Sequence, residues 1–309
     1  MKSPIRHVLH PALAVLFSAA ILAPSAALAD GWTARLLPDS LPELTFAADK
    51  AGRELIRIDR KGASPRIIRH DCIHGRVEGD KQKQGDLKTP EGVYFVTRKV
   101  AGPLDFMEYG PHAFALDYPN PVDRLRGKTG GGIWLHSKGR PIKGITTRGC
   151  LAVEQDVITG LVGTAVPGVP VVIAEHVDAA LLRPAPEPKE GEAERASAPD
   201  ASTEKKSRAA VLKALEGWAA ALKKDASDAM AYYDAKRFAA AGGDSMKEVR
   251  GRLSAKRLPR HGMSEACFFP GPGYTVTSWR ESGNGALHIL YWMTDKTGAP
   301  KIVGEKSIR

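Results

Sequence analysis

A histidine and a cysteine lie close together in the stretch "IWLHSKGRPIKGITTRGC", residues 133–150, where His136 ends a short apolar run and Cys150 follows a glycine. A thiol becomes a strong nucleophile when a neighbouring imidazole accepts its proton, and that imidazole must be held by a partner on its other nitrogen. The pair is therefore a candidate for cysteine acyl-transfer chemistry. From spacing alone, a hydrogen-bonded core histidine and a buried thiol remain an open alternative.

Neighbouring groups supply the rest of such a site. The backbone carbonyl of Ser137 is the expected partner of the second imidazole nitrogen, and Gly149 allows a tight turn before the thiol. The N–H groups of Gly149 and Cys150 are the expected donors to the oxyanion of a tetrahedral intermediate. A helix predicted at residues 154–162 would place Cys150 near a helix N-terminus, which lowers a thiol pKa.

The elements that carry this pair are mostly strands. Ile56 and Ile58 alternate with Arg57 and Asp59, and similar β-rich runs lie between glycine, proline and asparagine residues. We expect strands in residues 54–60, 66–77, 92–100, 113–119, 132–137 and 169–176. Many short strands with few helices predict a mainly β sandwich or barrel with small helices over residues 30–183. The Gly- and Pro-rich segment 102–132 is expected to form a flap over the site.

The C-terminal part has a different pattern. Val211, Leu215, Trp218 and Leu222 share one face of a predicted helix, and a second helix is predicted at residues 226–238. Strands are expected at 273–281, 286–295 and 300–309, the first two joined by the turn "SGNG". Residues 207–309 therefore predict an α+β domain. The segment 184–206, rich in Pro, Ala, Glu, Lys and Ser, predicts a disordered linker between the two domains.

The N-terminus predicts export. Lys2 and Arg6 precede an apolar run that ends in Ala27-Leu28-Ala29, so residues 1–29 read as a signal peptide and the mature protein as periplasmic or envelope-located. The net charge of +10 then points to an anionic envelope polymer as partner rather than nucleic acid, because no basic cluster is interleaved with aromatic residues. A generally solvated basic surface is the open alternative. Three cysteines leave at least one thiol unpaired. The oligomeric state is not predicted.

Three motifs in order resemble the L,D-transpeptidase (YkuD-type) family over roughly residues 45–176. His136 and Thr147-x-Gly149-Cys150 look like its catalytic signature, and "TPEGVY" (89–94) matches its T-P-x-G-x-Y element. "YPNPVD" (118–123) resembles the Y-P-N…D element of the murein-processing branch. The resemblance implies attack by Cys150 on the L-centre–D-Ala bond of peptidoglycan stem tetrapeptides. An amine acceptor gives transpeptidation, and water gives carboxypeptidation.

Two departures bear on the acceptor: Arg148 stands where many members have histidine, and Ala152 and Val153 follow where many have Arg or Asn. Both favour the Y-P-N branch, which includes hydrolysing members.

A catalytically silent wall-binding protein is the alternative from another class. No cofactor is expected. The resemblance and the local charge together imply these substrate-binding residues: Thr147, Arg148, Tyr118, Asn120 and His112.

The C-terminal pattern resembles the nuclear-transport-factor-like (SnoaL-like) cone fold, and the combination resembles cell-shape-determining L,D-carboxypeptidases. That resemblance implies a glycan-binding pocket lined by aromatic residues, with burial in a core as the alternative: Trp218, Tyr232, Trp279, Tyr291 and Trp292. His70, Cys72 and His74 share one face of a strand, but no fourth ligand is evident, so no metal site is predicted.

Overall fold

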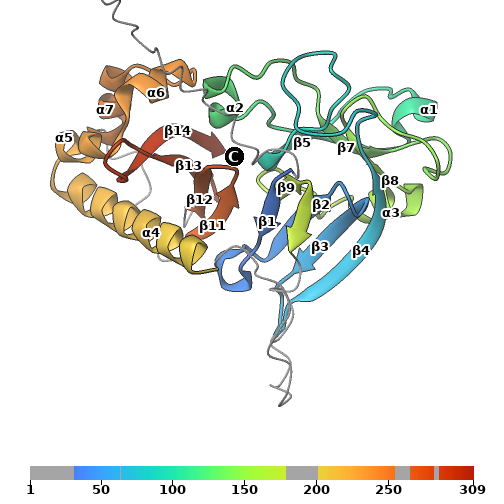
Figure 1. Ribbon diagram of the computed structural model, residues 1–309, viewed down its shortest axis with the longest axis horizontal. Helices are drawn as coiled ribbons and strands as arrows, with labels where there is room; N and C mark the ends of the chain where they lie inside the picture. Colours follow the sequence, from blue (N-terminus) through green and yellow to red (C-terminus); the bar gives the residue numbers. More distant parts are fainter. Residues whose placement is uncertain (1–30, 63, 179–200, 255–264, 282–284) are drawn as a thin grey trace, which may run out of the picture. The chain divides into compact units, whose positions relative to one another are not determined.

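The computed structural model describes residues 31–62, 64–178, 201–254, 265–281 and 285–309, and these lie within one compact unit, Gly31–Arg309 (Figure 1). The predicted signal peptide, residues 1–29, lies outside the described residues, as does most of the predicted linker. The last six residues of that linker, 201–206, belong to a helix instead, because this alanine- and lysine-containing stretch continues into a long amphipathic segment.

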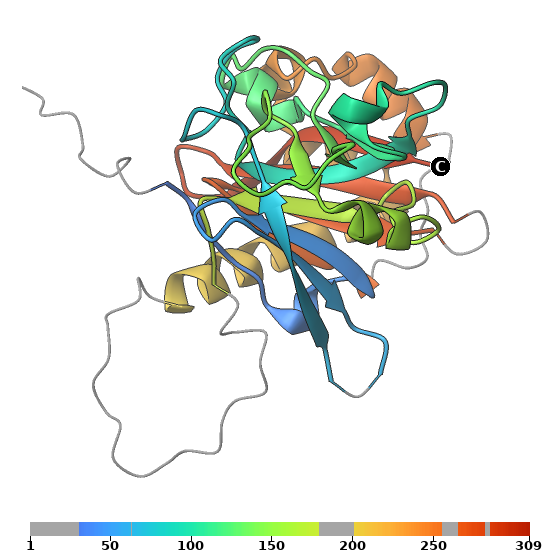
Figure 2. The same ribbon diagram turned by 90° about the vertical axis from the view of Figure 1, so that its right-hand side faces the viewer.

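The N-terminal part is a closed β-barrel, which agrees with the mainly β prediction. Its strand order is β2-β3-β4-β8-β7-β6-β5-β9, with parallel pairs at β2–β9 and β7–β8 and antiparallel pairs elsewhere. Figure 2 shows β3 and β4 running side by side. The strands are β2 (Leu44–Asp49), β3 (Glu54–Asp59), β4 (Arg66–Ile73), β5 (Gly92–Lys99), β6 (Ala113–Leu116), β7 (Trp134–Ser137), β8 (Leu151–Val153) and β9 (Pro170–Ala174).

Side-chain alternation gives the barrel two faces. Leu135, Leu151 and Val153 point into one apolar cluster with Phe114 and Tyr94, which fills the barrel. The intervening residues of β7 and β8 therefore point outward. Short elements cover the outside: β1 (Thr33–Arg35) paired with β10 (His176–Asp178), the 3-10 turn η1 (Pro38–Ser40), and the helices α1 (Phe106–Tyr109), α2 (Pro121–Leu125) and α3 (Gln155–Gly160).

The segment predicted as a flap is not one. Residues 102–132 contain β6, which pairs with both β5 and β7 and is part of the barrel wall. Glycine and proline there instead mark the turns around α1 and α2; Asn120 caps α2 and Pro121 opens it. The predicted helix after Cys150 is present as α3.

The C-terminal part packs four helices against an antiparallel sheet, β11-β12-β13-β14 (Figure 1). The predicted stripe Val211, Leu215, Trp218 and Leu222 is buried against that sheet. The elements are α4 (Ala201–Lys224), α5 (Ala226–Ala229), η3 (Met230–Tyr232), α6 (Ala235–Ala240), α7 (Met246–Ser254), β11 (Cys267–Gly271), β12 (Tyr274–Arg280), β13 (Leu287–Thr294) and β14 (Pro300–Ile308).

One predicted helix is divided in this part. Residues 226–238 form α5, η3 and the start of α6 rather than a single helix. The break occurs at Asp234, whose side chain accepts a hydrogen bond from the Arg237 N–H and so begins a new helix. Among the described residues, no helix is long and apolar enough to cross a membrane.

The two parts share one hydrophobic cluster. Val93 and Phe95 of β5 pack with Phe269, Tyr274 and other residues of the C-terminal sheet, and the Phe95 and Phe269 rings meet edge to face at 6.1 Å between centroids. The Tyr274 hydroxyl accepts hydrogen bonds from the Val93 N–H at 2.9 Å and from the Asn120 amide at 3.2 Å. The C-terminal sheet therefore completes the packing of the barrel.

Candidate active site

His136 and Cys150 are carried by neighbouring strands. His136 of β7 pairs in parallel with Ala152 of β8, and Leu135 pairs with Leu151, so Cys150 comes directly before β8. Leu135 and Leu151 point into the barrel, and alternation places His136 and Cys150 together on the outer face. Strand spacing and rise put their Cα atoms on the order of 8 Å apart. The fold thus brings together the two residues that the sequence singled out.

The His136 ring is buried and held at one nitrogen. Its Nδ1 lies 2.5 Å from the backbone oxygen of Ser137, which is the partner expected from the sequence. The ring of Tyr109, at the end of α1, covers it edge to face at 5.2 Å between centroids. Burial lowers the pKa of His136 to about 4, although the Ser137 carbonyl opposes that shift. The imidazole is therefore neutral at neutral pH, with Nε2 as its proton-accepting nitrogen.

Cys150 is partly buried, and its thiol lies 3.4 Å from the backbone oxygen of Gly132. Burial raises the pKa of Cys150, and the Trp134 backbone and Lys138 oppose that shift. The sequence argument that a helix start lowers this pKa is wrong. Cys150 precedes strand β8, and α3 begins only at Gln155, so the helix dipole does not act on the thiol.

The turn before Cys150 is built by backbone hydrogen bonds. The Thr147 hydroxyl donates to the Cys150 carbonyl at 2.6 Å and accepts from the Gly149 N–H at 3.1 Å. Gly149 has φ +132°, and a Cβ there would lie 2.7 Å from the Lys88 oxygen, so only glycine fits. Because its N–H is already bonded, Gly149 is not an available oxyanion donor as predicted; of the predicted pair, the Cys150 N–H remains.

Three of the residues expected to bind substrate are buried and form hydrogen bonds within the protein. Tyr118 and Asn120 are buried; the Tyr118 hydroxyl donates to the Thr129 carbonyl, and the Asn120 side chain caps α2. Thr147 is also buried and shapes the turn. In all three residues the polar groups bond to the protein itself, so the predicted contact with substrate has no support from their hydrogen bonds.

The other two residues expected to bind substrate, Arg148 and His112, differ in exposure. Arg148 is exposed and lies within electrostatic range of Tyr109, beside the thiol. His112 is partly buried, and both burial and Lys99 lower its pKa. It comes directly before Ala113, the first residue of β6, which pairs with His136. Arg148 and His112 both stay candidates for substrate contact.

Sequence reasoning missed two residues that cover or support the pair. Tyr109 contacts both His136 and Trp134, with ring centroids 5.0 Å apart in the second contact. Lys138 forms a 2.7 Å ion pair with Glu108 of α1 and so holds that short helix beside the site. The pattern "DFMEY" contains the signal for α1, since Asp105 caps it, but nothing local indicates which strand it covers.

Part of the chain is similar to known proteins. Residues 45–173 match the YkuD family model, described as the L,D-transpeptidase catalytic domain. The matched residues include both His136 and Cys150. A 65-residue stretch is also 38% identical to "Putative L,D-transpeptidase YafK" of Escherichia coli (strain K12), covering 21% of this chain. The match spans a quarter of the length of that relative.

Solved structures extend the likeness beyond the YkuD domain. Bd1075 of Bdellovibrio bacteriovorus is 24% identical with a TM-score of 0.57, covering 88% of this chain and 98% of that one. The helical cell shape determining protein Pgp2 of Campylobacter jejuni is 24% identical with a TM-score of 0.53, covering 87% of this chain and 95% of that one. These two structures therefore share the fold of both parts of this chain.

Most of the aromatic residues proposed to line a pocket are core residues. Trp218, Trp279, Tyr291 and Trp292 are almost completely buried, because they fill the contacts of the sheet with its helices and with the YkuD barrel. A cavity of about 570 Å³ lies beside them. It is lined partly by Trp32, Phe268, Tyr274, Trp292, Lys206 and Arg208. Of the five predicted residues, Trp292 lines it.

The candidate metal ligands on β4 are not arranged as a site. Both ring nitrogens of His74 lie 3.1 Å from backbone oxygens, those of Gly75 and Lys50, and Cys72 is buried. Within the described ranges, no group of three His, Cys, Asp or Glu side chains is placed to hold a metal ion. The thiols of Cys72, Cys150 and Cys267 are all unpaired.

Proposed function

We propose that this protein is an exported peptidoglycan-processing cysteine enzyme that attacks the L-centre–D-Ala bond of stem tetrapeptides. The observation that carries the proposal is the placement of Cys150 and His136 on one outer face of adjacent strands, with His136 Nδ1 fixed by the Ser137 carbonyl. The match of residues 45–173 to the YkuD family model supports the substrate class.

The residues support a general-base route. The Nε2 atom of His136 accepts the thiol proton as Sγ forms a bond to the substrate carbonyl carbon, and the Cys150 N–H stabilises the oxyanion. Collapse of the tetrahedral intermediate breaks the C–N bond. The D-Ala nitrogen leaves with the proton from Nε2, and the acyl group stays on Sγ as a thioester. An incoming nucleophile then gives its proton to His136 and displaces the thiolate, which recovers that proton.

The pKa shifts favour a neutral resting pair. Burial holds the pKa of Cys150 above its usual value and lowers the pKa of His136 to about 4. Between those values the thiol keeps its proton and the imidazole can accept one. The proton therefore moves during attack rather than beforehand, which protects the thiol from oxidation until a substrate is bound.

The acceptor distinguishes two outcomes of one acyl-enzyme. We propose an amine acceptor, which gives L,D-transpeptidation. Water is the alternative and gives L,D-carboxypeptidation; Arg148, Ala152 and Val153, which depart from the usual transpeptidase pattern, favour it. Because Pgp2, which shares this fold, is a helical cell shape determining protein, we extend the proposal to a role in cell shape.

A reaction with purified protein tests the proposal. Incubation with disaccharide tetrapeptide and mass analysis is expected to give cross-linked dimer for an amine acceptor, or tripeptide alone for water. Cys150→Ala is expected to lower turnover by roughly 10³-fold or more with an unchanged melting temperature. Cys267→Ala removes a thiol of the second part and is the matched control. Turnover that survives in Cys150→Ala contradicts the proposal and favours a wall-binding protein.

The cavity lined by residues of the first strand and of the C-terminal sheet supports a second, smaller proposal. Aromatic faces stack on sugars, and the cavity offers the partly exposed ring of Trp32 together with the partly exposed Arg208 side chain, whose guanidinium lies 5.5 Å from the Phe268 ring centroid. We propose that it binds a glycan of the cell wall. Trp32→Ala is expected to weaken binding of glycan chains without stem peptides about tenfold, measured by calorimetry, while turnover of soluble tetrapeptide persists.

A further inference from the structure

The "TPEGVY" segment, residues 89–94, has no atom in the proposed reaction, yet both of its ends make buried polar contacts. Thr89, at its start, is buried, and its hydroxyl accepts from the Gly75 N–H at 2.8 Å and donates to the Gly149 carbonyl at 2.9 Å. Gly149 is the residue before the nucleophile. The hydroxyl of Thr89 therefore joins this segment directly to the turn that carries Cys150.

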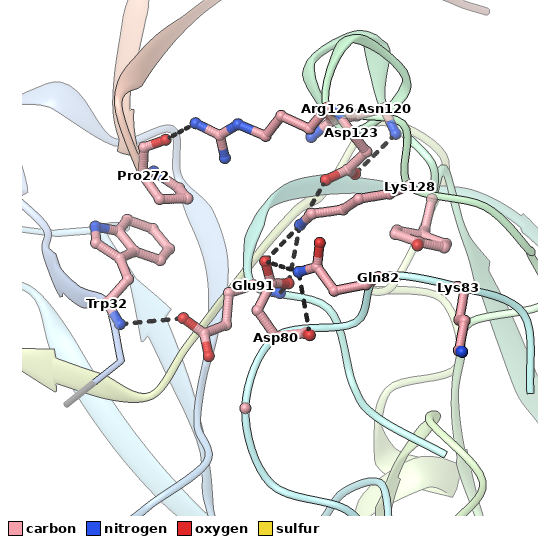
Figure 3. Close-up of polar contacts among 12 residues, drawn as sticks. Trp32, Asp80, Gln82, Lys83, Glu91, Asn120, Asp123, Arg126, Lys128 and Pro272 are labelled. Carbon is pink, nitrogen blue, oxygen red and sulfur yellow. Dashed lines mark hydrogen bonds and ion pairs between the residues drawn. The ribbon is translucent and has the colours of Figure 1, made fainter. Parts of the chain in front are cut away.

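The middle of the segment is anchored by buried charges. Asp80 accepts from the Glu91 N–H at 2.8 Å, and the Glu91 carboxylate bonds to the Lys50 ammonium at 2.8 Å and to the Trp32 N–H. Figure 3 shows Asp80 also bound by Lys128, whose ammonium reaches Asp123 on its other side. These contacts leave the backbone between Thr89 and Glu91 little freedom to shift.

The far end of the segment is anchored by the C-terminal part. The Val93 N–H donates to the Tyr274 hydroxyl of β12, which also accepts from Asn120. The Tyr94 hydroxyl donates to Asp123 at 3.0 Å, and Asn120 and Asp123 cap α2 together. The same six residues thus touch the C-terminal sheet at one end and the nucleophile turn at the other.

We propose that Thr89 is a positioning residue for Cys150, and that the C-terminal part, through Tyr274, holds the segment that carries Thr89. This rests on the proposed function of Cys150. Gly149 has no room to yield toward residue 88, because a Cβ there would lie 2.7 Å from the Lys88 oxygen. Loss of the Thr89 hydroxyl therefore lets the turn shift away from His136, and small misplacements of reacting atoms slow chemistry strongly.

Thr89→Val tests the near end, because valine keeps the shape and removes the hydroxyl. We expect kcat for tetrapeptide to fall about tenfold with KM within twofold, and Thr89→Ser to recover kcat to within threefold of wild type. Thr97→Val is the matched control: it loses a hydroxyl bond of 3.0 Å to the Ala115 carbonyl elsewhere in the barrel. Its kcat is expected to stay within twofold of wild type.

Tyr274→Phe tests the far end. We expect Tyr274→Phe to lower kcat about threefold in the wild-type protein. In the Thr89→Val background the same change is expected to lower kcat by less than 1.5-fold, because the effects of contacts in one network are not additive. Tyr233→Phe is its control, because this variant loses a partly buried hydrogen bond to Glu305 within the C-terminal part, away from the "TPEGVY" segment. Full additivity, or equal effects in Tyr233→Phe, overturns the role of the C-terminal part.

Alkylation of Cys150 by iodoacetamide, followed by peptide mass analysis, reads out position without any substrate. We expect Thr89→Val to slow it at least threefold relative to Thr97→Val. If the wild-type protein shows no turnover but Thr89→Val still slows alkylation, the proposed function is refuted and the positioning role of Thr89 is kept. Unchanged alkylation and kcat in Thr89→Val overturns the positioning role. If Thr89→Val does not fold, a Thr89→Ser variant with kcat reduced tenfold or more overturns it.

Discussion

Two covered regions of the barrel differ in how completely their buried polar groups are hydrogen-bonded. Next to the C-terminal sheet, Asn120, Asp123 and Lys128 each have several partners at hydrogen-bond distance. Beside the nucleophile, the Ser137 hydroxyl is buried without a partner in the described part of the chain, and the Cys150 thiol contacts only backbone groups, those of Gly132 and Trp134, among the described residues. Complete pairing fixes the first region in one arrangement, whereas incomplete pairing leaves atoms of the second available for chemistry.

The largest expected effect comes from breaking the paired region. Lys128→Ala leaves the buried Asp123 and the partly exposed Asp80 without their shared cation, and burial already raises the pKa of Asp123. We expect the free energy of unfolding, measured in urea, to fall by about 3–5 kcal/mol.

The matched control for that variant is a surface pair. Lys61 lies 3.7 Å from Glu43, with both side chains about three-quarters exposed. Lys61→Ala is expected to cost less than about 1 kcal/mol because water screens the pair. Equal losses in the two variants would contradict the claim that the buried network fixes this region.

The second prediction concerns the pH dependence of the reactive region. The base must be neutral to accept the thiol proton, and burial lowers the pKa of His136 to about 4. We therefore expect kcat/KM to remain level as pH falls through 6.5 and to decline only near pH 4.

Tyr109 provides the control for this pH profile. Tyr109→Ala removes the ring that covers His136, so water reaches the imidazole and the acid limb is expected to move upward toward 6.5. Tyr109→Phe keeps the ring and should leave the limb near its original pH. An acid limb at pH 6–7 in the wild-type protein would show that His136 is hydrated or is not the base.

The smallest expected effect is at Ser137. Its hydroxyl makes no hydrogen bond within the described residues, whereas its backbone carbonyl holds His136. Ser137→Ala is therefore expected to change the free energy of unfolding by less than about 1 kcal/mol, with any change toward stability. A loss of 2 kcal/mol or more in thermal or urea unfolding would reveal a partner for this hydroxyl and weaken the contrast between the two regions.

The sequence predicted the elements with strong local patterns. Alternation of Ile56 and Ile58 correctly indicated β3, and the stripe from Val211 to Leu222 correctly indicated the buried face of α4. It did not reveal β8, whose three residues carry no pattern of their own and become a strand only by pairing with β4 and β7. Nor did it reveal that Asp234 divides a helix, since capping competes with an otherwise helical pattern.

The site was predictable where backbone geometry follows from residue order. The Ser137 carbonyl is covalently next to His136, and its hydrogen bond to the ring was expected. The roles of Tyr118 and Asn120 were not, because motif residues next to a site and motif residues within it look alike in sequence. Only burial and hydrogen-bond partners separate them. Tyr109 was missed because the strand that it covers is distant in sequence.

The bond between Val93 and Tyr274 also has a consequence for the order of folding. These residues are 181 positions apart, and a ribosome releases the N-terminal one first. Until Tyr274 has been synthesised, the Val93 N–H and the Asn120 amide lack their shared acceptor, and Phe95 lacks Phe269. The barrel that carries the nucleophile can therefore reach its final packing only after most of the chain has been made. Assembly of the Cys150 thiol with the His136 imidazole is then delayed until the protein is nearly complete.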